Sequence, residues 1–283
     1  MARERKFLLA PRFTDRTTDS VSVKLHHTDL GGTGKPPMLV LHGLLGSSRN
    51  WLSTGRDLAH HFHVFALDAR NHGKSPHDPV MSFESMAQDI VAWMDAQGLA
   101  RATIVGHSMG GKTAMLLACR HPGRVERLVV VDIAPKDYSW AAHRAEFAAM
   151  NQLELTGLQS RAEAEMHFEA LVPHLGTRKF LATNLQRDGD GSWHWMINLP
   201  VLTETLPVVE KNCLAPDDRF TGPTLFVLGG LSRYAESGDH ALIARHFPAA
   251  RIEVIAESGH NPHMDTREEF VRLVLGGVSR AVV

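Results

Sequence analysis

The amino-acid sequence predicts an α/β protein with a mostly parallel sheet flanked by helices and with one inserted helical segment. Short apolar segments rich in β-branched residues alternate with helical patterns, which is typical of a parallel sheet covered by helices. Segments such as Leu128–Val131 are apolar without interruption, as expected of strands buried on both faces. The predicted strands are Val21–His26, Met38–His42, Val64–Asp68, Thr103–Gly106, Leu128–Asp132, Thr224–Leu228 and Ile252–Ile255.

The alternation of strands and helices stops between Ala134 and Pro216. Apolar residues there recur at helical spacing, as Met166 and Ala170 do. The segment also holds three of the five tryptophans of the chain: Trp140, Trp193 and Trp195. We therefore predict a helical cap over residues 134–216, inserted between a first core part (1–133) and a second core part (217–283).

Charge and hydropathy exclude several classes of partner. The 283 residues carry a formal net charge of −1, and their basic residues are scattered. We therefore expect no nucleic-acid partner and no binding to an anionic membrane surface. The longest apolar segments, such as Pro37–Leu41, fall far short of the roughly 20 residues that span a bilayer. No membrane span is expected, and the composition does not predict an oligomeric state.

The two cysteines and the first residues bear on localisation. Cys119 and Cys213 form neither a disulfide framework nor a metal quartet, so a reducing cytoplasm is the simplest prediction. The segment Met1–Pro11 has an apolar core too short for a secretion signal. An organelle remains an alternative, because three arginines could belong to a weak transit segment: Arg3, Arg5 and Arg12.

A candidate nucleophile lies in the segment Thr-Ile-Val-Gly-His-Ser-Met-Gly-Gly. It contains G-x-S-x-G at Gly106, Ser108 and Gly110, between a β-branched strand and a helical pattern. A strand, a sharp turn and a helix are what a nucleophilic serine needs, because the strained turn leaves the hydroxyl at the edge of the sheet. The alternative without chemistry is that Ser108 merely caps the helix.

The same residues also fit a phosphate-binding motif. Gly106-His-Ser-Met-Gly-Gly-Lys-Thr matches G-x-x-x-x-G-K-[ST], and Asp132 ends a following strand as a Mg²⁺-binding aspartate would. Nucleotide binding leaves the histidine motifs described next unexplained. It also leaves about 100 residues of strand and helix pattern before the loop without a role. The nucleophile hypothesis instead places Lys112 in the helix after the turn.

His42 and Gly43 end the second predicted strand. Acyl transfer places negative charge on an oxygen, which preorganised backbone N–H groups stabilise. After a nucleophile turn of this kind the donors are the residue after the serine and one from the loop after an earlier strand. Those residues are Met109 and Leu44. The alternative is an ordinary tight turn after the strand.

A candidate general base follows the last predicted strand. His260 lies in a glycine-containing loop and comes after both the nucleophile and the candidate acids, in the order Ser, Asp, His. Histidine titrates near neutral pH, as a general base must. His263 is the nearby rival. Three other histidines could suggest zinc, but no carboxylate or cysteine partner has a familiar spacing: His60, His61 and His63. We expect neither a metal nor a cofactor.

With these motifs in place, the chain resembles the α/β-hydrolase superfamily over nearly its whole length. The matching segments are His42-Gly43, Asp68-Ala-Arg-Asn-His-Gly-Lys-Ser75, Gly106-His-Ser-Met-Gly110 and Ser258-Gly-His260. The second of these, and Val131-Asp-Ile-Ala-Pro135, look most like a capped esterase subgroup. The resemblance implies an α/β-hydrolase fold and hydrolysis of carboxylic esters, or in some members of acyl-CoA thioesters.

The candidate triad acid departs from the pattern of most family members. Most carry it after the strand that is here Thr224–Leu228, where this chain has Ser232. Asp132 lies 24 residues beyond Ser108 (132 − 108) at the end of the following strand. The resemblance to the capped subgroup implies Asp132 as the acid and Ser232 as its accessory partner. Asp239 is the rival, although it is predicted to begin a helix (Asp239–Phe247).

The sequence thus predicts a serine hydrolase of carboxylic esters or acyl thioesters that works through an acyl-enzyme. Ser108 attacks, His260 moves the proton and Asp132 orients the histidine. The substrate is a small-molecule ester or thioester of unspecified chain length. The alternatives are a hydrolase of carbon–carbon bonds in ring-cleavage products, a binding protein with this fold, and the nucleotide-binding protein considered above.

Overall fold

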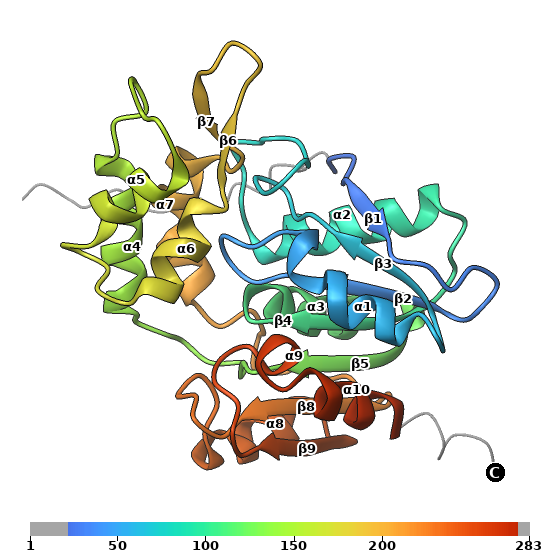
Figure 1. Ribbon diagram of the computed structural model, residues 1–283. Helices are drawn as coiled ribbons and strands as arrows, with labels where there is room; N and C mark the ends of the chain where they lie inside the picture. Colours follow the sequence, from blue (N-terminus) through green and yellow to red (C-terminus); the bar gives the residue numbers. More distant parts are fainter. Residues whose placement is uncertain (1–21, 277–283) are drawn as a thin grey trace, which may run out of the picture.

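The computed structural model describes residues 22–276 (Figure 1). Several residues used in the predictions lie outside this range: Met1–Pro11, the arginines at positions 3, 5 and 12, and Val21. The localisation prediction that depends on them stays untested. Among the described residues, no helix has both the length and the apolar character needed to cross a membrane.

Strands and helices alternate through the first core part. They are β1 (His27–Asp29), β2 (Pro37–Leu41), the 3₁₀ turn η1 (Ser48–Trp51), α1 (Leu52–Leu58), β3 (His63–Leu67), α2 (Phe83–Ala96), β4 (Ala102–His107), α3 (Met109–Arg120), η2 (Pro122–Arg124) and β5 (Val125–Val131). After the inserted segment come β8 (Thr224–Gly229), η3 (Ser237–Asp239), α8 (His240–His246), β9 (Ala250–Ile255), α9 (Pro262–Asp265) and α10 (Arg267–Gly276).

These strands form a seven-stranded sheet in the order β1-β3-β2-β4-β5-β8-β9. Only β1 is antiparallel to its neighbour, so the predicted mostly parallel sheet is confirmed. Parallel pairing places the carboxyl ends of β4 and β5 side by side, with His107 opposite Val131. The residues that follow these two strands are therefore neighbours in space.

The first strand prediction is wrong in position. The strand is His27–Asp29, whereas residues 22–26 are not a strand. Side chains bind the backbone there: the Val23 N–H donates to Asp89 Oδ1 (2.8 Å) and the His26 N–H donates to Ser75 Oγ (2.9 Å). These backbone groups are therefore not free to pair with a neighbouring strand.

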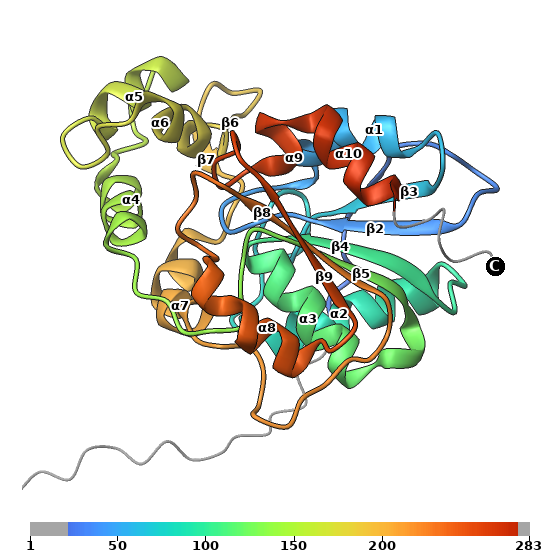
Figure 2. The same cartoon turned by 90° about the horizontal axis from the view of Figure 1, so that it is seen from below.

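Alternate residues of each central strand enter two separate apolar cores. In β2, Met38 and Val40 pack on the side of α1 and α10, whereas Leu39 and Leu41 pack on the side of α2 and α3. Figure 2 shows α1, α9 and α10 on one face of the sheet and α2, α3 and α8 on the other. Covering both faces explains why the central strands are apolar without interruption.

The segment between β5 and β8 contains four helices and a hairpin, and it lies beside the sheet without adding a strand to it (Figure 1). The elements are α4 (Ala141–Gln152), α5 (Arg161–Phe168), α6 (Leu175–Ala182), β6 (Leu185–Arg187), β7 (Trp193–Trp195) and α7 (Leu199–Glu210). The core and cap boundaries at residues 134 and 216 stay a prediction.

The expectation that this whole segment is helical is wrong at the hairpin of β6 and β7. Its turn is the run Asp188-Gly-Asp-Gly191, in which the Gly191 N–H donates to the Asp188 carbonyl and Gly191 has a φ of 90°. Aspartate and glycine favour this geometry, and they end the helical pattern that precedes the turn. The ring of Trp193 then packs beneath the guanidinium groups of Arg161 and Arg187.

Candidate active site

Ser108 lies at a strained turn between β4 and α3. Its backbone has φ 52° and ψ −116°, a region that L-residues seldom adopt. A Cβ on Gly106 would lie 2.2 Å from the Gly110 carbonyl oxygen, and one on Gly110 would lie 2.6 Å from that of His42. Both glycines are thus required by close backbone contact. The Ser108 side chain accepts no hydrogen bond from the helix, so it does not cap α3 in the way the alternative supposed.

Asp132 and His260 meet beside this turn. The His260 ring lies with Nδ1 2.7 Å from Asp132 Oδ2. The Asp132 side chain is fully buried, and its other oxygen, Oδ1, accepts the Gly229 N–H at 2.8 Å. Asp132 directly follows β5, as Ser108 follows β4. A carboxylate that accepts from an imidazole Nδ1–H fixes the tautomer in which Nε2 is free to take a proton.

The predicted accessory partner, Ser232, and the rival acid, Asp239, lie in different surroundings. The Ser232 hydroxyl donates to Asp132 Oδ2, the oxygen that faces His260, and accepts the Tyr234 N–H at 3.2 Å. Asp239 does not contact His260. Its Oδ2 is 2.6 Å from the Lys136 ammonium and accepts the Glu236 N–H. The structure therefore places Asp132 and Ser232 beside His260. Asp239 instead forms an ion pair at the N-terminus of α8.

The predicted oxyanion donors lie on either side of Ser108. Met109 is the first residue of α3, where a helix N–H lacks an intrahelical acceptor. The Leu44 N–H has no acceptor among the described residues, and Leu44 follows Gly43, which packs against Ser108. A Cβ on Gly43 would lie 3.2 Å from that of Ser108. Both N–H groups thus adjoin the serine and remain available to an oxygen.

Two neutral histidines hold the loop that carries Leu44. His42 donates from Nδ1 to the Gly43 carbonyl and accepts the Ala69 N–H at Nε2. His72 donates from Nδ1 to the Arg70 carbonyl and accepts the Leu45 N–H at Nε2. Burial lowers the pKa of both rings, that of His72 to about 3. The Asp-Ala-Arg-Asn-His-Gly motif thus supports the candidate oxyanion loop from behind.

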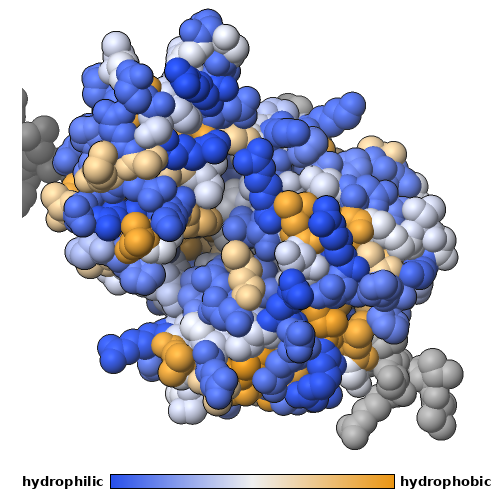
Figure 3. All heavy atoms as spheres, viewed as in Figure 1, coloured by the Kyte–Doolittle hydropathy of each residue, from blue (hydrophilic) through white to orange (hydrophobic). Residues whose placement is uncertain are grey.

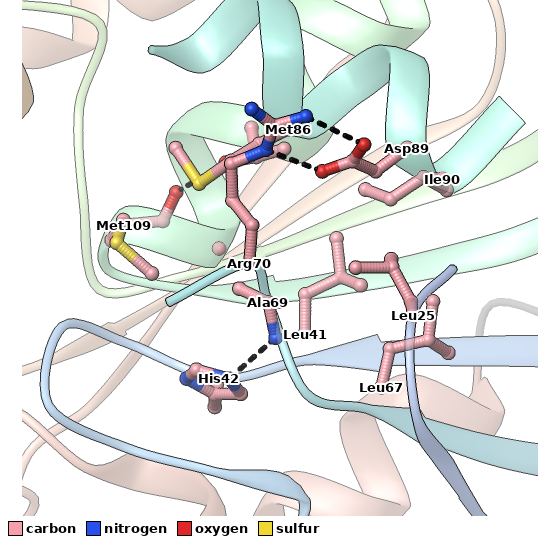
Figure 4. Close-up of a pocket in the computed structure, with 12 residues that line it drawn as sticks. Leu25, Leu41, His42, Leu67, Ala69, Arg70, Met86, Asp89, Ile90 and Met109 are labelled. Carbon is pink, nitrogen blue, oxygen red and sulfur yellow. Dashed lines mark hydrogen bonds and ion pairs between the residues drawn. The ribbon is translucent and has the colours of Figure 1, made fainter. Parts of the chain in front are cut away.

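Arg70 of the same motif anchors this support to α2. Its guanidinium forms a buried bidentate pair with Asp89, with nitrogen–oxygen distances of 2.6 and 2.8 Å. Figure 4 shows this pair and His42 around an internal cavity of about 20 Å³, which Met109 also lines. Such a space holds one or two water molecules at most. Of the two candidate oxyanion donors only Met109 borders it, and it is too small for a substrate.

The rival base, His263, is buried at the edge of the site. Its ring stacks on Trp51 at 4.2 Å and packs near His107, while its Nδ1 has no hydrogen-bond partner among the described residues. Burial lowers the pKa of His263 to about 3. His107 in turn lies with Nε2 2.8 Å from the His260 carbonyl oxygen, which fixes the backbone of the His260 loop. Neither ring contacts Asp132.

The buried histidines predict a loss of stability in acid. Between pH 6.5 and about 3, an unfolded chain binds a proton at His263 that the folded chain rejects, so the free energy of unfolding falls as the pH falls. The slope is about 1.4 kcal/mol per pH unit for each such histidine. Urea unfolding at pH 4.5, 5.5 and 6.5 should show a shallower dependence for His263→Phe, by about 1 kcal/mol per pH unit.

The exposed His60 provides the control for this measurement, because His60→Gln should leave the slope as in the wild type. Equal slopes for the wild type and His263→Phe would contradict a neutral buried ring at this position.

A cleft of about 460 Å³ opens over Ser108 and His260. Figure 3 shows the surface dipping between the part formed by α4–α7 and the part formed by the sheet. The cleft lining is mixed: apolar side chains come from Leu44, Leu45, Phe180 and Met264, and polar ones from His107, His143, Glu146, His174 and Tyr234. No lysine or arginine is among the described residues that line it. Burial raises the pKa of Glu146 to about 7.

Sequence reasoning missed several of these residues, among them His143, Glu146 and Tyr234. The Tyr234 ring stacks on His260 with centroids 3.5 Å apart and planes 14° apart, and its hydroxyl is 3.4 Å from His143 Nε2. No motif contains them, because the packing of α4 on the loop after β8 brings them to the site. Only the two-residue spacing of Tyr234 from Ser232 connects it with a predicted site residue.

Lys112 is not placed as in a phosphate-binding loop. Its ammonium is buried and donates to three carbonyl oxygens at the end of α7, those of Val209, Glu210 and Lys211. It also lies 4.7 Å from the centre of the Tyr138 ring. Burial lowers its pKa to about 8. Lys112 therefore ties α3 to the end of the inserted segment and does not reach toward Ser108.

The three histidines considered as zinc ligands have different surroundings. His60 and His61 are exposed, and His63 is 3.0 Å from Asp29 at the edge of the sheet. Residues 22–276 contain no group of three or more histidine, cysteine, aspartate or glutamate side chains that could hold a metal ion.

Comparison with known proteins agrees with this geometry. A family model described as the alpha/beta hydrolase fold matches residues 36–164. The chain is 41% identical to the mouse sn-1-specific diacylglycerol lipase ABHD11 over 253 residues, 86% of this chain and 81% of the mouse chain. It is 37% identical to the esterase YbfF of Escherichia coli K12 over 238 residues, 84% of this chain and 91% of that one.

Solved structures agree as well. A marine microorganism esterase superposes with a TM-score of 0.87 at 35% sequence identity, and the match covers 90% of this chain and 99% of the esterase. The similarity to these proteins extends over most of each chain. This chain therefore belongs to the α/β-hydrolase family and is an esterase-type hydrolase.

Proposed function

We propose that this protein hydrolyses carboxylic esters through an acyl-enzyme on Ser108. The observation that supports this most is the pairing of the buried Asp132 with His260, which lines the same cleft as Ser108. A serine is a weak nucleophile unless a neighbouring base takes its proton, and an imidazole oriented by a carboxylate is such a base.

In the proposed mechanism Ser108 Oγ attacks the ester carbonyl carbon and His260 Nε2 takes the hydroxyl proton. The N–H groups of Leu44 and Met109 stabilise the oxyanion. His260 then gives the proton to the leaving alcohol, and the carbon–oxygen bond breaks. Water, deprotonated by His260, attacks the acyl-enzyme and releases the carboxylic acid, which restores the Ser108 hydroxyl.

Asp132 is proposed to hold His260 in the reactive tautomer and to stabilise the imidazolium that forms at each proton transfer. Ser232 is proposed as an accessory partner, because its hydroxyl donates to the same carboxylate oxygen. That bond adds a neutral donor to Oδ2 and keeps the carboxylate from rotating. The Oδ1 bond to the Gly229 N–H acts in the same sense.

We propose neutral carboxylic esters as the substrate class, in preference to acyl thioesters of coenzyme A. Among the described residues, the cleft over Ser108 carries no lysine or arginine of its own to pair with the phosphates of such a thioester; the basic side chains nearby, Arg49 and Lys179, line an adjoining pocket that shares Leu45 and Phe180 with it. A panel of p-nitrophenyl esters and acyl-CoAs of matched chain length should give kcat/KM values at least about tenfold higher for the esters. Faster turnover of the acyl-CoAs would make the enzyme a thioesterase. Turnover of dienol diketones would instead favour cleavage of carbon–carbon bonds.

Two further parts of the proposal concern the location of the protein and the inserted segment. The two free thiols, Cys119 and Cys213, favour a cytoplasmic location. Residues 134–216 are proposed to act as a cap that closes one side of the cleft, because α4 and α6 contribute to its lining. The partner is a small-molecule ester.

A further inference from the structure

The proposed general base, His260, has an aromatic ring stacked on one face of its imidazole. The ring is that of Tyr234, with centroids 3.5 Å apart and planes 14° apart. The contact with Asp132 Oδ2 holds the imidazole at Nδ1, on one edge, so the ring can still tilt about that bond. A side chain that lies flat on the imidazole restricts this tilt. The mechanism proposed above gives Tyr234 no role.

The backbone of Tyr234 is fixed on both sides of its Cα atom. The Tyr234 N–H donates to Ser232 Oγ at 3.2 Å, and the Tyr234 carbonyl oxygen accepts the Tyr138 hydroxyl at 2.6 Å. The Ser232 hydroxyl in turn donates to Asp132 Oδ2. The residue that stacks on the imidazole is therefore connected to the same carboxylate oxygen that faces the imidazole.

The residues that precede α4 pack against the Tyr234 ring. The Trp140 ring lies 4.8 Å from it, centroid to centroid. Trp140 also stacks on Tyr138, with centroids 4.4 Å apart and planes 27° apart. Trp140 is not among the described residues that line the cleft, whereas Tyr234 is. The start of the inserted segment thus limits the movement of the Tyr234 side chain without facing the substrate.

A stacked aromatic ring also acts on the charge that His260 acquires. In the proposed mechanism His260 becomes a cation each time it takes a proton from Ser108 or from water. The face of an aromatic ring attracts a cation that lies within about 6 Å of its centre. Tyr234 therefore stabilises the charged imidazolium more than the neutral imidazole. An interaction that is stronger in the transition state than in the ground state raises kcat and leaves KM nearly unchanged.

We propose that Tyr234 is a positioning residue for ester hydrolysis: it holds the His260 imidazole in its reactive orientation and stabilises the imidazolium, while Trp140 holds Tyr234 in place. This inference rests on the proposed reaction at Ser108. Because Tyr234 also lines the cleft, its test must separate this role from contact with the substrate.

Tyr234→Leu should lower kcat for p-nitrophenyl butyrate by about tenfold and keep KM within about twofold of the wild type. The rate constant for labelling of Ser108 by a fluorophosphonate should fall by a similar factor, because that reaction also needs His260 to take the serine proton. Tyr234→Phe keeps the ring without the hydroxyl and should restore most of both rates. Trp193→Leu, which removes a half-buried ring from the hairpin, is the matched control and should keep the wild-type constants.

Trp140→Leu tests the same role from outside the cleft, and it keeps the proposal testable if Tyr234→Leu does not fold. It should lower kcat by about twofold to fivefold with an unchanged KM, because the Tyr234 ring is then held less firmly. Circular dichroism and thermal melting establish that each variant is folded. A normal kcat in folded Trp140→Leu would overturn the part of the proposal that concerns Trp140, and with an unfolded Tyr234→Leu it would overturn the whole.

Three results with folded Tyr234 variants would overturn the positioning role and leave ester hydrolysis standing. One is a Tyr234→Leu enzyme with wild-type constants. Another is a raised KM with a normal kcat, which would mean that Tyr234 binds the substrate. The third is an equal loss of rate in Tyr234→Phe and Tyr234→Leu, which would assign the effect to the hydroxyl. If the wild type neither hydrolyses the ester nor is labelled at Ser108, the proposed function itself fails.

Discussion

Ser108→Ala is expected to abolish ester hydrolysis and labelling by a fluorophosphonate. The alanine removes the only atom that can form the acyl bond, and loss of the nucleophile in a serine hydrolase lowers kcat by roughly 10⁶-fold. The remaining rate, from the oxyanion donors and substrate binding, should be only about 10³–10⁴-fold above that in water. Steady-state kinetics on p-nitrophenyl butyrate and mass spectrometry of the labelled protein measure both effects.

The variant should remain folded, because the Ser108 side chain caps nothing and α3 is held by its apolar face. Relief of the strained backbone at this turn is not expected, since alanine also disfavours a positive φ. Ser192→Ala, in the turn region of the hairpin, is the matched control and should label and hydrolyse as the wild type does. A folded Ser108→Ala enzyme with normal turnover would remove the serine from the mechanism.

The parts of the fold that were predicted correctly are those that burial dictates. Strands such as β4 and β5 are covered on both faces, so their side chains must be apolar throughout, and that pattern is visible in the sequence. The first strand was misplaced because its position depends on side chains far along the chain. Asp89 and Ser75 bind the backbone before His27, and no local pattern contains that information.

In the candidate site, too, local patterns identified some residues, whereas residues placed by tertiary packing were missed. Ser108 and Asp132 follow neighbouring parallel strands, so chain order and strand order were enough to bring them together. His260 was found because it follows the last strand of the sheet. His143 and Glu146 of α4 were missed, because the way α4 packs over the cleft has no signature in spacing or composition. Motifs thus identify the residues on the sheet edge, whereas the residues that face them come from tertiary packing.

The Asp-Ala-Arg-Asn-His-Gly motif after β3 shows a different limit of prediction from sequence. Its residues were recognised by resemblance alone, and their role became visible only in three dimensions. His72 accepts the N–H of Leu45, and Arg70 pairs with Asp89 behind the loop. Because the donors of an oxyanion site must be fixed before the reaction, the support of this loop is part of the proposed catalytic apparatus. A sequence pattern can mark such residues without indicating what they hold.

Asp132→Asn is expected to lower kcat by about two to four orders of magnitude. In the wild type, Asp132 Oδ2 faces His260 Nδ1 while Oδ1 accepts the Gly229 N–H. An asparagine keeps Oδ1 on Gly229 and turns its amide NH₂ toward the histidine. That group cannot accept from Nδ1–H, so the imidazole adopts the tautomer with its proton on Nε2 and can no longer take the proton of Ser108.

Two further variants separate this assignment from its rivals. Ser232→Ala removes one neutral hydrogen bond to Asp132, worth about 0.5–1.5 kcal/mol, and should lower kcat by about tenfold or less. Asp239→Asn should stay near the wild type, because Asp239 pairs with Lys136 and has no contact with His260. Matched steady-state kinetics on the three folded variants decide between them. An inactive Asp239→Asn beside a working Asp132→Asn would mean that the acid reaches His260 from the loop before α8, and that the hydrogen bond between Asp132 and His260 does not serve catalysis.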